Sequence, residues 1–296
     1  MNVYKLSVSD WDEKPLNKTV FEQETGKKSP WYVNNSEGAS SNFAVCPGCD
    51  NPIQILGFYR QLANTNKPFA RHHRYSIPNL AVYRQVAYDY CPYAAPRQYE
   101  RAARRAGNDP LSNKILDILV PNFDRVIYIL EQDIGIKISD RLAEELLVDY
   151  QGQGGAFYMG ATLQNIPWIF AYMTRSKSLM GRMVTNDDVM LEVIKDRVPN
   201  VALNGKQLTW KGGKYVDLQF CFIDHRARHI DGKLQETMEI MVTLGRSNQQ
   251  IYRKLIEFDR DRFRNLLRVS PDRAKRPRQE KLVSLAAKIL GYCERE

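Results

Sequence analysis

The chain has 296 residues, of which 43% are hydrophobic and 26% charged, and its formal net charge is +9. These values are typical of a globular protein with one large or two ordinary domains, and they exclude a disordered chain. No stretch approaches the roughly 18 apolar residues of a membrane span, and residues 1–11 lack the apolar core of a signal peptide. Five cysteines, an odd number, argue against a disulfide framework. We therefore expect a reduced, cytoplasmic protein without a membrane partner.

Residues 1–44 show no regular apolar period, and Asn, Ser, Gly and Lys dominate between Thr25 and Asn42. We predict an extended, loop-rich lead-in for this segment. The following segment, residues 45–96, contains a short strand near Ile53 and a helix over residues 79–90, where apolar side chains recur at helical spacing.

Cysteine and histidine gather in residues 45–96. A C-x₂-C pair is followed by two adjacent histidines and then by a third cysteine, at the end of the predicted helix. Tetrahedral Zn²⁺ takes four sulfur or nitrogen ligands and commonly uses such a pair as its first corner. Only one of two adjacent histidines is expected to bind, because neighbours on an extended backbone point to opposite sides. The predicted ligands are Cys46, Cys49, Cys91 and either His72 or His73.

Three thiolates and one imidazole leave no open position on the metal, so the predicted Zn²⁺ site is structural rather than catalytic. The alternative is that the C-x₂-C residues belong to an ordinary turn and that Cys91 is a core thiol.

Residues 97–245 predict a mostly helical body with an antiparallel β meander. Helices are expected over residues 97–106, 112–119, 123–133, 140–150 and 185–197, with Asp109 or Ser112, Ser139, and Thr185 or Asn186 as N-caps. The meander is expected from strands 207–210, 215–230 and 233–244, because Asp231-Gly232 is a favoured hairpin dipeptide.

Residues 246–296 predict basic C-terminal helices. Ser247 or Asn248 is expected to cap a helix that reaches Leu266, and Ser270-Pro271 restarts the chain. Between Arg246 and Lys288, thirteen Lys and Arg residues stand against five Asp and Glu residues. Clustered positive charge is typical of proteins that bind a polyanion.

Basic side chains also alternate with aromatic ones around the predicted metal site, as expected where phosphates and stacked bases are bound. The alternatives are an aromatic core and solvated arginines. The residues predicted to contact nucleic acid are Arg71, Arg74, Arg101, Arg104, Arg105, Arg268, Arg273, Lys275, Arg276 and Arg278.

The predicted hairpin over residues 224–239 contains acidic and histidine side chains that could form a catalytic group. Registered on the Asp231-Gly232 turn, Asp224 faces Glu239, and two carboxylates so placed can bind a divalent metal. His225 and His229 share a face of a regular strand. These four residues are candidates for a catalytic group, but the polar face of a solvated hairpin is the favoured explanation, because hairpins usually alternate in this way.

The sequence therefore predicts an α+β protein in which a small zinc module is packed on a mostly helical body with an antiparallel meander. The favoured function is DNA or RNA binding without catalysis, as a subunit or adaptor of a larger nucleoprotein assembly. One alternative is a metal-dependent nuclease or phosphodiester hydrolase that uses the 224–239 hairpin. Another is a protein–protein scaffold whose basic surface meets an acidic partner.

Overall fold

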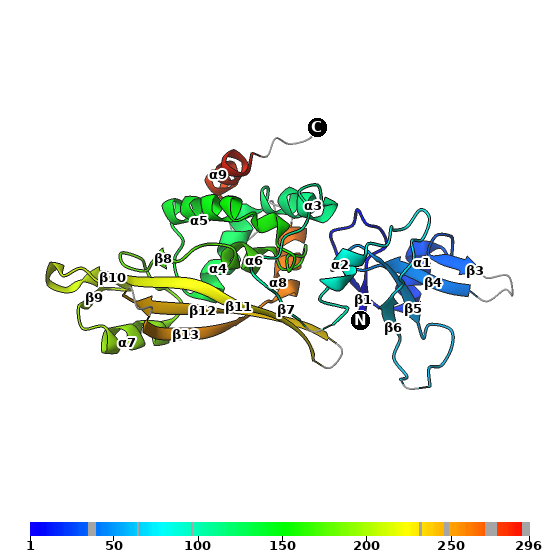
Figure 1. Ribbon diagram of the computed structural model, residues 1–296, viewed down its shortest axis with the longest axis horizontal. Coiled ribbons are helices and arrows are strands. Elements are labelled where there is room, and N and C mark those ends of the chain that lie inside the picture. The colour runs from blue at the N-terminus through cyan, green and yellow to red at the C-terminus, as the bar shows by residue number, and fades with distance from the viewer. Residues whose placement is uncertain are drawn as a thin grey trace. The chain divides into compact units, whose positions relative to one another are not determined.

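A computed structural model of the chain describes residues 1–34, 40–63, 65–95, 97–230, 233–245, 249–269 and 277–291. The chain divides into two compact units. Unit 1 comprises residues 1–97 and 227–235, and unit 2 comprises residues 98–226 and 236–296. Both units contain helices and antiparallel strands, which confirms the mixed α+β class (Figure 1). None of the described helices is long and apolar enough to cross a bilayer.

Unit 1 is built on an antiparallel sheet with the strand order β3-β4-β5-β6. Phe43 and Val45 of β4 pack with Leu80 and Ala81 in a small buried cluster. The elements of unit 1 are β1 (Val3–Tyr4), β2 (Lys14–Pro15), α1 (Lys18–Thr25), β3 (Tyr32–Asn34), β4 (Ser40–Val45), β5 (Pro52–Leu56), β6 (Phe69–His72) and α2 (Gln85–Asp89).

The structure of residues 1–44 differs from the predicted loop-rich lead-in. The side chain of Asn17 accepts a hydrogen bond from Val20 N–H and so caps helix α1. Lys5 and Val45 exchange two backbone hydrogen bonds, each 2.9 Å long. The residues before 45 therefore belong to the same unit as the predicted metal ligands. Their very short strands offer too few residues for an apolar alternation to be recognised.

Unit 2 contains a sheet with the strand order β13-β12-β11-β7, and β8 also pairs with β11. Its elements are α3 (Pro110–Leu119), α4 (Phe123–Ile134), α5 (Asp140–Gly152), η1 (Gly155–Phe157), α6 (Ile166–Tyr172), β8 (Lys177–Ser178), α7 (Asp188–Arg197), β9 (Val201–Asn204), β10 (Gln207–Trp210), η2 (Lys211–Gly213), β11 (Leu218–Ile230), β12 (Lys233–Leu244), β13 (Gln249–Glu257), α8 (Arg260–Arg268) and α9 (Glu280–Leu290). Strand β7 (Arg97–Gln98) spans the unit boundary, and the ends of β11 and β12 enter unit 1.

The core of unit 2 lies between this sheet and helices α4, α5 and α6, which run along one side of it (Figure 1). The side chains of Phe220, Phe222 and Met238 in this sheet are buried. Trp168 of α6 stacks on Phe258, with ring centroids 4.9 Å apart. Aromatic stacking thus joins the helical layer to the end of the sheet.

Two predicted helix starts in unit 2 are confirmed, because in each the predicted capping side chain accepts a backbone hydrogen bond from the first turn of the helix. Asp109 accepts hydrogen bonds from Leu111 and Ser112 N–H, and Ser139 accepts one from Leu142 N–H. The helix predicted to start at Thr185 or Asn186 is instead capped by Asp187.

The predicted order of the meander is wrong. Residues 207–210 form β10, which pairs with β9 in a separate two-stranded sheet. The third strand of the meander is β13, in a segment predicted as helix, and helix α8 begins only after Asp259. The mostly helical body is therefore not confirmed, and residues 97–106 contain no helix. Asp231-Gly232, Ser247, Asn248 and Ser270-Pro271 lie outside the described residues.

Candidate metal centre

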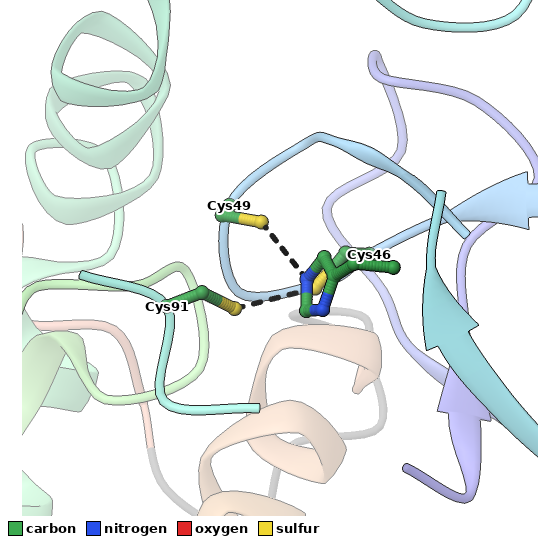
Figure 2. Close-up of side chains that lie close together, drawn as sticks. Cys46, Cys49 and Cys91 are labelled. Carbon is green, nitrogen blue, oxygen red and sulfur yellow. Dashed lines mark hydrogen bonds between the residues drawn. The ribbon is translucent and has the colours of Figure 1, made fainter. Parts of the chain in front are cut away.

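Three cysteines and one histidine converge in unit 1. The ligand atoms of Cys46, Cys49, His72 and Cys91 all lie within 4.8 Å of one another. Figure 2 shows the three sulfur atoms turned toward a common point. Among the residues that the structure describes, this is the one such group of His, Cys, Asp or Glu side chains.

The spacing of these atoms fits tetrahedral zinc. Zn–S and Zn–N bonds of about 2.3 and 2.05 Å place ligand atoms at tetrahedral corners about 3.8 Å apart for two sulfurs and about 3.6 Å for sulfur and nitrogen. Sγ of Cys46 lies 3.5 Å from Sγ of Cys91, and Sγ of Cys49 lies 3.4 Å from Nε2 of His72. The side chains therefore surround a space of the size that one zinc ion occupies.

The first two ligands lie on a tight turn. Asp50 N–H donates to the carbonyl of Cys46 at 3.0 Å, and Asp50 has a left-handed φ of 58°. Gly48 is required here, because a Cβ would lie 2.9 Å from the Tyr93 ring and 3.3 Å from Sγ of Cys91. The turn can thus approach the third cysteine only without a side chain at residue 48.

The other two ligands come from elements attached to this turn. His72 ends β6, where it pairs with Ile53 of β5. Cys91 follows α2, and Asn51 ties the turn to the start of that helix. Its side chain donates to the Arg84 carbonyl at 3.0 Å and accepts from Arg84 N–H at 2.7 Å. The fully buried Asn51 amide therefore holds the turn that carries Cys46 and Cys49 against the helix that precedes Cys91.

A buried ion pair supports the same turn. Nζ of Lys5 lies 2.5 Å from Oδ1 of Asp50, and both side chains are almost completely buried. The backbone of Lys5 pairs with Val45, directly before the first ligand. Removing either partner alone would leave a buried charge without compensation.

The three thiols influence one another's ionisation. Burial opposes ionisation of Cys46, but hydrogen bonds from Cys49 and Cys91 bring the pKa of Cys46 well below its ordinary value. Burial and hydrogen bonding to Cys46 raise the pKa values of Cys49 and Cys91. Hydrogen bonding within the cluster thus lowers the pKa of one thiol and raises those of its two neighbours. A dication bound here would ionise all three, so metal binding would release protons.

Comparison of the chain with protein-family models, with curated proteins and with solved structures finds no significant match.

His73 does not belong to the cluster. Its ring packs edge-on against Phe43 at 5.0 Å and lies 5.6 Å from the ring of Tyr75. Burial, followed by the charge of Arg71, lowers the pKa of His73. Of the two adjacent histidines, only His72 lies with the three cysteines, as expected for successive side chains of a strand.

Two of the predicted nucleic-acid contacts lie on the surface of unit 1. Arg71 and Arg74 are both exposed. Arg71 donates to the side chain of Gln54 at 3.1 Å. The guanidinium of Arg74 lies 5.0 Å from the ring centre of Tyr88 and donates to its hydroxyl.

The central cluster of predicted contacts has a different environment. The guanidinium of Arg101 donates to the carbonyls of Thr174 and Phe222. Arg104 donates to the carbonyl of Gln153, and Arg105 donates to those of Tyr158, Met159 and Ala161. These three side chains attach the loop after β7 to the rest of unit 2. Because their guanidinium groups donate to backbone carbonyls, they are not included in the proposed nucleic-acid-binding surface.

The C-terminal predicted contacts are only partly described. Arg278 pairs with Asp124 at 2.7 Å and so attaches the start of α9 to α4. Arg268 is exposed at the end of α8. The residues Arg273, Lys275 and Arg276 lie outside the described residues, and their role stays a prediction.

The hairpin acids Asp224 and Glu239 are joined by an arginine. Arg253 of β13 lies 2.9 Å from Oδ2 of Asp224 and also contacts the carboxylate of Glu239. Arg226 lies 3.4 Å from the same Asp224 oxygen. A guanidinium therefore neutralises the two acids at the place that a divalent cation would take.

The two predicted hairpin histidines have unlike environments. His229 is exposed in unit 1, whereas His225 is fully buried in unit 2. His225 lies between the rings of Tyr99 and Phe258, with centroids 5.0 and 5.5 Å away. Its Nε2 lies 3.4 Å from Oε1 of buried Glu236. This pair belongs to the core of unit 2 and does not form a group with Asp224 and Glu239.

We expect no metal-dependent nuclease activity from the hairpin, because Arg253 already compensates both carboxylates. The measurement is incubation of purified protein with labelled single- and double-stranded DNA and RNA in Mg²⁺ and in Mn²⁺. Arg253→Ala serves as a matched variant, because it removes the guanidinium that pairs with Asp224 and Glu239. Cleavage by the wild type that disappears in Asp224→Ala and Glu239→Ala, with folding intact, would contradict this expectation.

Residue-pattern reasoning missed several residues that shape these sites. Lys5 and Asn51 carry no metal-ligand signal, and Tyr88 lies within the predicted helix over residues 79–90 without a local sign of its contact with His72. The Pro-Gly between the two cysteines was the one local signal of a tight turn.

Proposed function

We propose that unit 1 binds a structural Zn²⁺ through Cys46, Cys49, His72 and Cys91 and uses the surface above that site to bind nucleic acid. The set of three thiols and one imidazole selects zinc over harder cations. Four protein ligands leave no open coordination position, so the ion serves folding rather than catalysis.

The observation that carries the nucleic-acid proposal is a partly exposed aromatic and arginine cluster in contact with the proposed metal ligand His72. Tyr88 meets the His72 ring edge-on at 5.1 Å, and Arg74 covers the outer face of Tyr88. The ring of Tyr83 lies 6.3 Å from that of Tyr88. Tyr75, whose ring lies 5.6 Å from that of His73, leaves 73% of its surface exposed.

Such a cluster combines the two contacts that a nucleic acid offers. Arginine side chains pair with phosphate, and tyrosine and guanidinium planes stack on unpaired bases. Large exposed aromatic surface is unfavourable in water and marks interaction sites when it is clustered. These features support a binding subunit or adaptor of a nucleoprotein assembly over an enzyme. Because the proposed ligands are reduced thiols, we propose a cytoplasmic location.

We expect Arg71→Gln combined with Arg74→Gln to weaken binding of a labelled 20-nucleotide single strand and to flatten its salt dependence. Each neutralised phosphate on a single strand contributes roughly 0.7 to the slope of log K against log salt, so two lost contacts change the slope by roughly 1.4. The measurement is fluorescence anisotropy over a salt series with DNA and RNA, each single- and double-stranded.

The matched control is Arg141→Gln with Arg175→Gln, which removes two exposed charges from unit 2. Equal weakening by both double variants would point to net charge alone and contradict a specific surface. Competition by polyglutamate as strong as that by nucleic acid would favour the scaffold with an acidic partner. A third variant, Arg273→Gln with Lys275→Gln and Arg276→Gln, tests the remaining C-terminal prediction while leaving the Arg278 ion pair intact.

A further inference from the structure

Unit 2 carries a second exposed group of aromatic and basic side chains, at residues 210–215, which we call the 210–215 loop. Its sequence is Trp-Lys-Gly-Gly-Lys-Tyr. Trp210 leaves 46% of its surface exposed, and Tyr215 leaves 79% exposed. Lys211 and Lys214 are exposed between them.

The local backbone explains why both rings face outward. Trp210 ends β10 two residues after buried Leu208, at the last pair of the β9–β10 ladder. Gly212 and Gly213 then take left-handed φ values of 60° and 71°, which turn the chain sharply. Val216 returns to the interior directly after Tyr215.

The loop has a defined conformation. Lys211 N–H donates to the carbonyl of Asn200 at 2.9 Å, and Lys214 N–H donates to that of Lys211 at 3.3 Å. These hydrogen bonds fasten both sides of the glycine turn. The aromatic rings are therefore presented by a structured loop, which lowers the entropic cost of binding a partner.

The charged side chains within the 210–215 loop are both positive. The sequence has no acidic residue between Arg197 and Asp217, while Lys206, Lys211 and Lys214 are basic. Lys206 pairs with Asp188 at 2.7 Å. Within the described part of the chain, Lys211 and Lys214 have no acidic partner, so their charges are available to an anion.

We infer that the 210–215 loop is a second contact for single-stranded nucleic acid. Bases stack on Trp210 and Tyr215, and phosphates pair with Lys211 and Lys214. The inference depends on the proposed function for the class of ligand but uses residues of the other unit. An anionic lipid surface also attracts lysine and aromatic side chains, but interfacial binding relies on a continuous apolar face, and here two cations and two glycines separate the rings.

The test measures binding of labelled 20-mers of poly(dT) and poly(U) by full-length, metal-loaded protein. We expect Trp210→Ala with Tyr215→Ala to weaken binding at least ten-fold, because each lost base stack weakens binding about five-fold or more. Lys211→Gln with Lys214→Gln is expected to flatten the salt dependence, whereas the exposed helix control Lys195→Gln with Lys281→Gln leaves it unchanged. Bound poly(dT) should also quench the intrinsic tryptophan fluorescence of the wild-type protein more than that of the Trp210→Phe variant.

The result is compared with that of the Arg71→Gln and Arg74→Gln variant of unit 1. Weakening by the loop variants supports the inference, whether or not the unit 1 variant also weakens binding. Wild-type affinity in the loop variants, together with weakening in the unit 1 variant, overturns the inference and leaves the proposed function standing. Absence of binding by wild type overturns both. Cosedimentation with phosphatidylserine vesicles that depends on Trp210 and Tyr215, without any effect on oligonucleotide binding, replaces the inference with a membrane contact.

Discussion

Replacing Cys46 or Cys91 with serine is expected to abolish stoichiometric zinc binding and to unfold unit 1. Structural zinc sites contribute about 10–16 kcal/mol of apparent binding free energy at neutral pH, and this energy is coupled to folding. A serine hydroxyl cannot replace the thiolate, and the other buried thiols then lose the cation that ionises them. Elemental analysis should give about one zinc per wild-type chain, and urea unfolding should show loss of the unit 1 transition.

Two residues outside the proposed ligand set provide matched controls for this experiment. His73→Asn changes the histidine adjacent to the ligand His72, and Cys221→Ser changes a free cysteine of unit 2. Both variants should retain zinc. The cobalt-substituted wild type should show the visible spectrum of a tetrahedral thiolate site. Freshly purified, unchelated wild type without zinc would disprove the site.

Replacing Glu236 with glutamine is expected to destabilise unit 2 by about 1–3 kcal/mol, the usual cost of leaving buried hydrogen-bonding groups without their partner. Glu236 and His225 are both almost completely buried. The same carboxylate accepts a hydrogen bond from Asn165 Nδ2 at 2.9 Å. The free energy of unfolding from urea denaturation measures this effect. Glu239→Gln, on the outer face of the same strand, is the control and should cost less than about 1 kcal/mol.

The Glu236 pair also predicts a pH dependence. Burial alone would raise the pKa of Glu236, but His225 and the charge of Arg260 bring it below its ordinary value. Its ionisation therefore contributes stability that is complete above the unfolded pKa of about 4.3 and is lost as the pH falls through the folded pKa. Wild type should lose stability in acid more steeply than Glu236→Gln. Parallel acid profiles for the two proteins would contradict the assignment.

The metal ligands could be predicted from sequence because their chemistry is local and their residue types are scarce. A C-x₂-C pair reports a tight turn without knowledge of the fold. The choice between His72 and His73 could not be made, because it depends on which face of β6 meets the turn. That face is set by the pairing of β6 with β5, over residues distant in sequence.

The catalytic candidates were wrongly grouped because strand alternation changes phase inside β11. Phe220 and Phe222 are buried, but after Asp224 the buried residues are His225 and Ala227. Asp224 has a left-handed φ of 57°, as in a β-bulge. Such a change moves each later side chain to the opposite face. An aspartate at this position gives no clear sequence signal, although Asp tolerates the conformation better than most residues.

The C-terminal strand was missed for a different reason. Ile251, Leu255 and Phe258 recur at helical spacing, so local periodicity favoured a helix. In the structure, Ile251 and Ile256 are buried side chains of strand β13. This strand pairs with β12, and the register of the pairing shifts at Val242/Thr243. The irregularity removes the simple alternation that would have identified a strand, and pairing with β12 stabilises it against the local preference.

The division of unit 1 between residues 1–97 and 227–235 has a consequence for how the chain matures on the ribosome. All four proposed metal ligands emerge by Cys91, long before β11 and β12 are synthesised. With zinc bound as proposed, a nascent chain can fix the N-terminal sheet before the rest of the chain is made. Residues 227–235 complete unit 1 only after residues 98–226 of unit 2 have emerged. Folding of unit 1 thus begins first but can finish only once a large part of unit 2 has left the ribosome.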